Sequence, residues 1–159
     1  MTLILTKVHL QIMADHAEAI YPAECCGLLL GRQELAPDHR WVHELRPLAN
    51  QWTPEVNPFD DEDAVTPVSQ DNRYWIDPRS LMTAQRDSRD RGWIILGVYH
   101  SHPDAPAVPS ERDRQLAWSG YSYPILSVVK GQVAMISSWR LDSNEQFSVE
   151  AIATQTSIS

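Results

Sequence analysis

Two histidines separated by one residue, His100 and His102, follow the most strand-like run of the chain, residues 93–99. Residues two apart on an extended chain point to the same side, with Cα atoms roughly 6.5 to 7 Å apart, so both imidazoles can reach one ion. A catalytic zinc typically has three protein ligands and keeps one position for water. The pair alone is a weak signal, because His-x-His occurs often by chance.

Asp113 is the candidate for a third ligand. Ten residues separate it from His102, and three prolines stiffen this span while leaving it long enough to fold back onto a metal. Residues 110–113 (Ser-Glu-Arg-Asp) also have a purely structural interpretation, because Ser-x-x-Asp resembles a capping box at the start of a helix. The joint pattern, His-Ser-His-Pro followed by Ser-x-x-Asp after a buried strand, favours the metal centre.

The elements that must position these residues form an ordered series. Apolar runs, helical periodicity and turn residues predict a short opening strand at 3–5, helices near 7–20, 78–91 and 111–119, and strands near 25–30, 40–48, 93–99, 125–129, 132–139 and 146–152. The run Cys25–Leu30 is apolar throughout, which is typical of a strand buried on both faces. The order βαββαβαβββ predicts an α+β, α/β-like fold: a single mixed β-sheet flanked by helices.

Residues 51–73 differ from the rest of the chain. This segment holds three prolines and six acidic residues, so it has little to bury and is expected to be a mobile surface loop or an insertion between two core elements. Trp52 is expected to be exposed at its edge, where a large aromatic could meet a substrate.

Length and charge exclude several classes of protein. A chain of 159 residues predicts one domain spanning 1–159, and a formal net charge of −8 disfavours nucleic acid as a partner. The adjacent Cys25 and Cys26 rarely suit a disulfide, which indicates a reducing compartment and core packing for both. Without a leader or a bilayer-length apolar run, we expect a cytoplasmic protein with no membrane partner.

The sequence resembles the JAMM/MPN family of zinc metalloproteases, whose motif is a distant Glu followed by His-x-His-x10-Asp, commonly with Ser three residues before the Asp. The resemblance extends to residues 22–31, 47–50, 76–78 and 97–103, and covers roughly 3 to 140. It implies an MPN/cytidine-deaminase-like architecture and one Zn²⁺ per chain, with His100, His102 and Asp113 as ligands. It further implies that Glu24 is the general base and that Ser110 donates to the oxyanion.

Short bacterial members of the family are similar to enzymes that trim the C-terminal tail of ubiquitin-like sulfur-carrier proteins. The resemblance therefore implies a metallopeptidase or isopeptidase acting on a ubiquitin-like or sulfur-carrier protein with a Gly-Gly-type tail. The alternatives are a non-catalytic MPN-type interaction or scaffold domain and a zinc hydrolase of small amides. A zinc deaminase is disfavoured, because its His-x-Glu and Pro-Cys-x-x-Cys patterns are missing.

Overall fold

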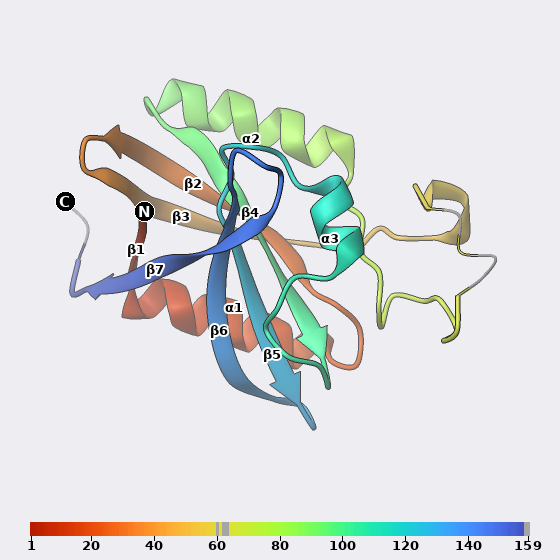
Figure 1. The fold of residues 1–159 in the computed structure, drawn as a ribbon. Coiled ribbons are helices and arrows are strands. Elements are labelled where there is room, and N and C mark those ends of the chain that lie inside the picture. Colours follow the sequence, from red (N-terminus) through yellow and green to blue (C-terminus); the bar gives the residue numbers. More distant parts are fainter. Residues whose placement is uncertain (60, 62–63, 158–159) are drawn as a thin grey trace.

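The computed structural model of the chain describes residues 1–59, 61 and 64–157. The predicted order of strands and long helices is confirmed (Figure 1). The elements are β1 (Thr2–Thr6), α1 (Lys7–Ile20), β2 (Cys26–Leu35), β3 (Asp38–Leu48), the 3-10 helix η1 (Pro54–Val56), α2 (Pro78–Asp90), β4 (Ile94–Pro103), α3 (Glu111–Leu116), β5 (Tyr123–Val129), β6 (Gln132–Leu141) and β7 (Phe147–Gln155).

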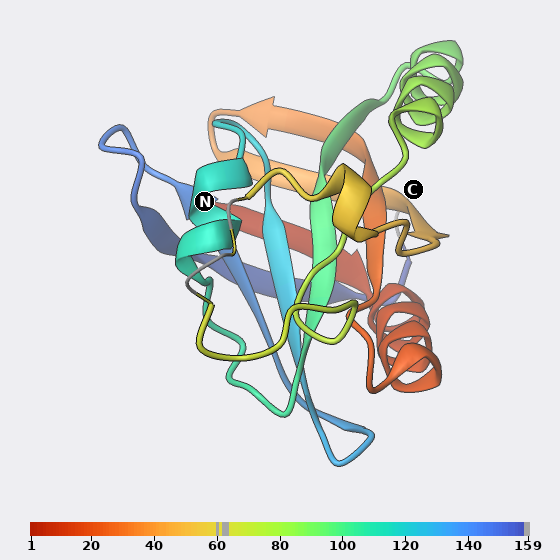
Figure 2. The ribbon, with the colours of Figure 1, turned by 90° about the vertical axis from the view of Figure 1, so that its right-hand side faces the viewer.

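The sheet is mixed, as predicted, but it closes on itself. Its strands follow the order β1-β3-β2-β4-β5-β6-β7 and form a barrel, so the expectation of one sheet simply flanked by helices is corrected. The closure depends on β1, which pairs in parallel with β3 on one side and with β7 on the other. Both edges of this short strand are thereby hydrogen-bonded, which leaves no open end of the sheet at β1. Figure 2 shows the strands from the side.

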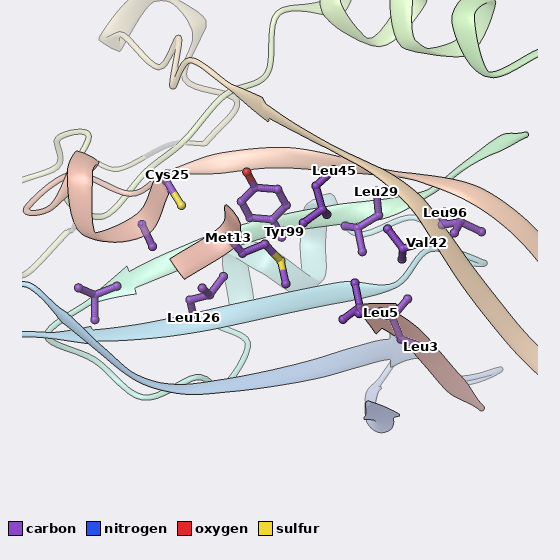
Figure 3. Close-up of a cluster of buried hydrophobic side chains, with 12 residues drawn as sticks. Leu3, Leu5, Met13, Cys25, Leu29, Val42, Leu45, Leu96, Tyr99 and Leu126 are labelled. Carbon is purple, nitrogen blue, oxygen red and sulfur yellow. The ribbon is translucent and has the colours of Figure 1, made fainter. Parts of the chain in front are cut away.

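Two apolar clusters hold the helices to the strands. In Figure 1, α2 lies above the strands, whereas α1 lies lower in the view, behind β5 and β6. Leu29 of β2 belongs to the cluster that Met13 and Ala17 of α1 complete (Figure 3), whereas Leu28 and Leu30 face the cluster that includes Ala84 of α2. The strand is therefore buried on both faces, as its continuous apolar run predicted.

The ends of α1 and α2 follow from their terminal residues. Thr6 caps α1 by accepting a hydrogen bond from the backbone nitrogen of His9, and the chain turns away at Tyr21, just before Pro22. Asp77 caps α2 by accepting from the backbone nitrogen of Arg79, and Pro78 occupies the first helical position. The predicted bounds of both helices are accurate to within one residue.

Cys25 and Cys26 are both fully buried and unbonded to each other, which confirms the predicted core packing. Burial raises the pKa of the Cys25 thiol to about 11. A thiol with so high a pKa stays protonated near neutral pH and behaves as a small apolar side chain.

The segment 51–73 does not behave as an unattached surface loop. Trp52 is buried, with an exposed fraction of 7%, so its predicted exposure is wrong. Asn50 Oδ1 accepts a hydrogen bond from the Trp52 backbone nitrogen at 3.0 Å, and the Gln70 side-chain amide donates to the Trp52 carbonyl at 3.0 Å. These bonds turn the start of the segment inward.

None of the helices in the described part of the chain combines the length and the apolar character that crossing a bilayer would require.

Candidate active site

His100 and His102 lie within β4 itself, which extends to Pro103 and not only to residue 99 as predicted. The strand is held between β2 and β5: Cys26 of β2 pairs with His100, and Ser127 of β5 pairs with His102. Both histidines are buried. Because the strand is paired on both sides, the two imidazoles have a fixed backbone beneath them.

The two histidines and Asp113 form one compact cluster. The His100 and His102 Nε2 atoms are 3.0 Å apart, and each lies 3.2 Å from a different carboxylate oxygen of Asp113. Burial alone would raise the pKa of Asp113, but the adjacent imidazoles hold it well below its ordinary value. A carboxylate that stays ionised between two imidazole nitrogens is a suitable metal ligand.

The donor set fits a zinc ion. Among the described residues, this is the one group of three metal-ligating side chains, with ligand atoms within 4.8 Å of one another. Tetrahedral angles at bond lengths of about 2.0–2.1 Å place ligand atoms roughly 3.3 Å apart. The observed separations of 3.0 and 3.2 Å are close to that value. Two imidazoles and one carboxylate also match the ligand chemistry of a catalytic zinc site.

The predicted capping box of Ser110 and Asp113 is confirmed, and its geometry leaves the Asp113 carboxylate in contact with the histidines. Ser110 Oγ caps α3 by accepting a hydrogen bond from the Asp113 backbone nitrogen, and the Asp113 carboxylate accepts from the Ser110 backbone nitrogen. The same carboxylate contacts both histidines. The capping box therefore holds the Asp113 carboxylate at the two histidines as well as starting a helix.

Glu24 lies at the mouth of β2, in a small pocket of about 30 Å³ that Ser110 and Asp113 also line. Its backbone nitrogen donates to the Gln70 carbonyl at 2.7 Å, and its own carbonyl accepts from the Asn50 amide at 3.0 Å. Burial, followed by the nearby Asp113 charge, raises the pKa of the Glu24 carboxyl well above its ordinary value. The structure thus brings the five predicted site residues together.

Sequence reasoning missed the residues that enclose this pocket from the segment 51–73 and its end. Phe59, Arg73 and Tyr74 line it, as does Arg112 of α3. Asp61 accepts hydrogen bonds from both Arg73 and Arg112, which ties the segment to α3. The two arginines are 12 and 51 residues from Asp61 along the chain, so no local pattern signalled these contacts.

The sequence comparisons place this geometry in a family. Residues 6–142 match the family described as prokaryotic homologues of the JAB domain. The chain belongs to this family. The JAB domain is the family that the resemblance to JAMM/MPN proteins predicted. The matched region contains His100, His102 and Asp113.

Two curated relatives are similar to this JAB-family chain. It is 30% identical over 137 residues to a protein of Haloferax volcanii named desampylase, a match that covers 77% of this chain and 84% of that protein. It is 34% identical over 98 residues to a Thermus thermophilus protein named a probable TtuB-protein conjugate cleaving protease. That second match covers 61% of this chain and about half (51%) of the Thermus protein.

Solved structures share the fold. A solution structure of a Desulfitobacterium hafniense protein is 31% identical, with a TM-score of 0.76 over 99% of this chain and 95% of the other. The crystal structure of a JAB1/MPN domain protein from Archaeoglobus fulgidus is 17% identical, with a TM-score of 0.52 over 96% of this chain and 98% of the other. The latter likeness concerns the fold alone.

Proposed function

We propose that this chain is a zinc-dependent metallopeptidase that hydrolyses an amide or isopeptide bond at the C-terminal tail of a ubiquitin-like or sulfur-carrier protein. One observation carries the proposal: a buried carboxyl group, Glu24, shares a pocket with Asp113, the aspartate whose carboxylate also contacts His100 and His102. The names of the two curated relatives, a desampylase and a conjugate-cleaving protease, support the reaction class. Residues 1–159 would act as one domain.

His100, His102 and Asp113 would hold the zinc ion through the atoms that already converge, the two Nε2 atoms and the carboxylate oxygens. When bound there, zinc would act as a Lewis acid that polarises the scissile carbonyl and would lower the pKa of a bound water to about 7. The buried β4 fixes both imidazoles, and the Ser110 backbone nitrogen restrains the Asp113 carboxylate.

Glu24 would move the proton. Its carboxylate oxygen takes a proton from the attacking water and passes it to the nitrogen of the leaving amine. A general base works best when its pKa approaches the working pH, and burial in this pocket shifts the Glu24 pKa in that direction.

Ser110 would stabilise the developing negative charge on the substrate oxygen. Its Oγ already accepts a hydrogen bond from the Asp113 backbone nitrogen, so its hydroxyl proton is free to be donated. Removing one such donor typically costs ~10²-fold or more in rate.

The pocket favours a slender substrate. Its volume of about 30 Å³ and its wall of Tyr74 and Phe59 leave little room for a bulky side chain. A C-terminal Gly-Gly tail lacks side chains and exposes its backbone for hydrogen bonding, which suits a narrow passage.

We also propose a cytoplasmic site of action. The two buried, free cysteines are consistent with this location.

The test combines metal content with cleavage. The substrate is a ubiquitin-like sulfur-carrier protein with a C-terminal extension after its Gly-Gly end. It is incubated with wild type, with Glu24→Gln or with the double variant His100→Ala, His102→Ala. The masses of the products are then measured by mass spectrometry. We expect about one zinc per chain in wild type and in Glu24→Gln, no zinc in the double variant, and cleavage by wild type alone. Glu34→Gln, at an exposed position on β2, is the matched control and should cleave normally.

Two outcomes would contradict the proposal in different ways. An uncleaved carrier with zinc bound would overturn the substrate assignment. A wild-type protein that takes up no metal even after reconstitution would overturn the hydrolytic mechanism and leave an interaction domain as the better conclusion.

A further inference from the structure

The two histidines of the cluster are held in different ways. His102 directs its Nε2 toward the cluster and has its other ring nitrogen, Nδ1, 2.9 Å from the Pro106 carbonyl. Such a hydrogen bond fixes the tautomer and the ring orientation of a metal-binding histidine. His100 also directs Nε2 toward the cluster, yet its buried Nδ1 has no hydrogen-bond partner within the described ranges.

Tyr74 occupies the position from which the His100 ring can be held instead. The two rings are stacked, with centroids 4.8 Å apart and an angle of 27° between their planes. His102 lies at the same centroid distance from His100 but meets it edge-on, at 61°. Tyr74 is therefore the ring that covers a face of His100.

The backbone around Tyr74 is itself anchored. Asn50 donates through its side-chain amide to the Arg73 carbonyl at 2.9 Å and accepts through its Oδ1 from the Trp75 nitrogen at 3.2 Å. The residues on both sides of Tyr74 are thus bonded to one side chain, and the ring also packs against the apolar cluster beneath α2. A ring restrained in this way can restrain its neighbour.

We propose that Tyr74 is a positioning residue that fixes the ring plane of His100 by stacking and so keeps Nε2 directed at the metal. It takes the role that the Pro106 carbonyl has for His102. This inference rests on the proposed function, because it assumes that the cluster holds a metal. Residues that orient a metal ligand typically contribute 10- to 100-fold to metal affinity.

The test measures metal binding directly. The apo forms of wild type, Tyr74→Ala, Tyr74→Leu and Tyr74→Phe are titrated with zinc against a chromophoric chelator, and the absorption spectrum of the cobalt(II)-loaded forms reports ligand geometry. Trp93→Leu is the matched control, since Trp93 packs against the same apolar cluster as Tyr74 but stacks on His43, a histidine outside the site. Circular dichroism and thermal unfolding of the apo forms verify that each variant is folded.

We expect Tyr74→Ala and Tyr74→Leu to bind zinc roughly 10-fold more weakly and to show an altered cobalt spectrum. Tyr74→Phe, which keeps the ring, should remain within about 2-fold of wild type in zinc affinity, and Trp93→Leu should be unchanged. Tyr74→Leu keeps apolar bulk, so it remains informative if Tyr74→Ala fails to fold.

Wild-type affinity in Tyr74→Leu would overturn the inference, and so would equal losses in Tyr74→Phe and Tyr74→Leu, since the ring would then not be what matters. Either result would leave the proposed function standing if wild type binds zinc and cleaves. A wild type without metal would instead overturn both.

Discussion

Ser110 and Asp113 are hydrogen-bonded to each other in both directions, at 3.1 Å through the serine hydroxyl and at 2.7 Å through the aspartate carboxylate. The carboxylate oxygen that accepts from the Ser110 nitrogen also lies 3.2 Å from His102 Nε2. The first turn of α3 and the cluster of His100, His102 and Asp113 therefore share one side chain, so a change that loosens the turn also displaces the Asp113 carboxylate.

Two substitutions at Ser110 should separate its capping role from its proposed hydroxyl donor. Ser110→Ala removes both and is expected to lower the free energy of unfolding by about 1 kcal/mol, whereas Ser110→Gly should cost only a few tenths, because glycine is a tolerable N-cap. Both should reduce cleavage by ~10²-fold. Chemical denaturation and cleavage rates check this, and near-normal cleavage by Ser110→Gly would show that the hydroxyl is not the donor.

Asn50→Ala should destabilise the protein by about 1–3 kcal/mol, since it leaves buried or half-buried backbone groups without their partner. The Asn50 amide donates to the carbonyls of Glu24 and Arg73. Its loss should therefore also detach the segment 51–73 from the rest of the fold and make it easier to cleave with a protease. Urea denaturation and limited proteolysis measure the two effects. Asn144→Ala, in an exposed turn, is the control, and equal stability of the two variants would refute the prediction.

Glu150 should give the stability a pH dependence of definite sign. It is buried and accepts hydrogen bonds from Ser122 and Ser138, and burial raises the pKa of its carboxyl above its ordinary value of 4.5. The folded state therefore binds this proton more tightly than the unfolded state does, so the stabilisation is fully present below pH 4.5 and is lost as the pH rises through the folded pKa.

Glu150→Gln imitates the protonated carboxyl but does not titrate, so its stability should lack this pH dependence. The free energy of unfolding of wild type, minus that of Glu150→Gln, is expected to fall as the pH is raised from 4 to 7. Urea denaturation at a series of pH values measures it. A difference that stays constant or grows with pH would count against the assignment to Glu150.

Gly97→Ala should be among the most damaging single substitutions, because a Cβ at this position would lie 1.9 Å from the Ser122 carbonyl oxygen. Here β4 approaches the Ser122 backbone too closely for any side chain, and we expect a loss of about 3 kcal/mol or more in the free energy of unfolding. Gly120→Ala is the control: no described residue has an atom within 4 Å of its Cβ, and its positive φ of 88° costs only about 1–2 kcal/mol. Thermal unfolding compares the two, and a Gly97→Ala protein as stable as Gly120→Ala would disprove the clash.

Local patterns were sufficient for the elements and for most of the cluster. The bounds of α1 and α2 could be predicted because Thr6, Asp77 and Pro78 act on neighbouring backbone. His100, His102 and Asp113 could be predicted because strand geometry and a short stiffened loop fix how they meet. Glu24 came only from the family resemblance, since an acid at a strand entrance carries no signal of its own.

Long-range contacts explain what was missed. The burial of Trp52 depends on Asn50 and Gln70, and the attachment of the segment 51–73 depends on Asp61 reaching Arg112, 51 residues away. The stack of Tyr74 on His100 joins residues 26 positions apart, and the sequence carries no signal that pairs them. None of these pairings leaves a periodic pattern, because each depends on a single residue outside the helices and strands, such as Trp52, Asp61 or Tyr74.

The closure of the barrel has a consequence for any shortened form of the protein. The family match ends at residue 142, but β7 lies beyond it and pairs with both β6 and β1. A chain cut at the end of the match would expose the hydrogen-bonding edges of two strands to water at once. Exposed strand edges recruit strands from other molecules, so such a fragment should self-associate at concentrations where the intact chain stays dispersed.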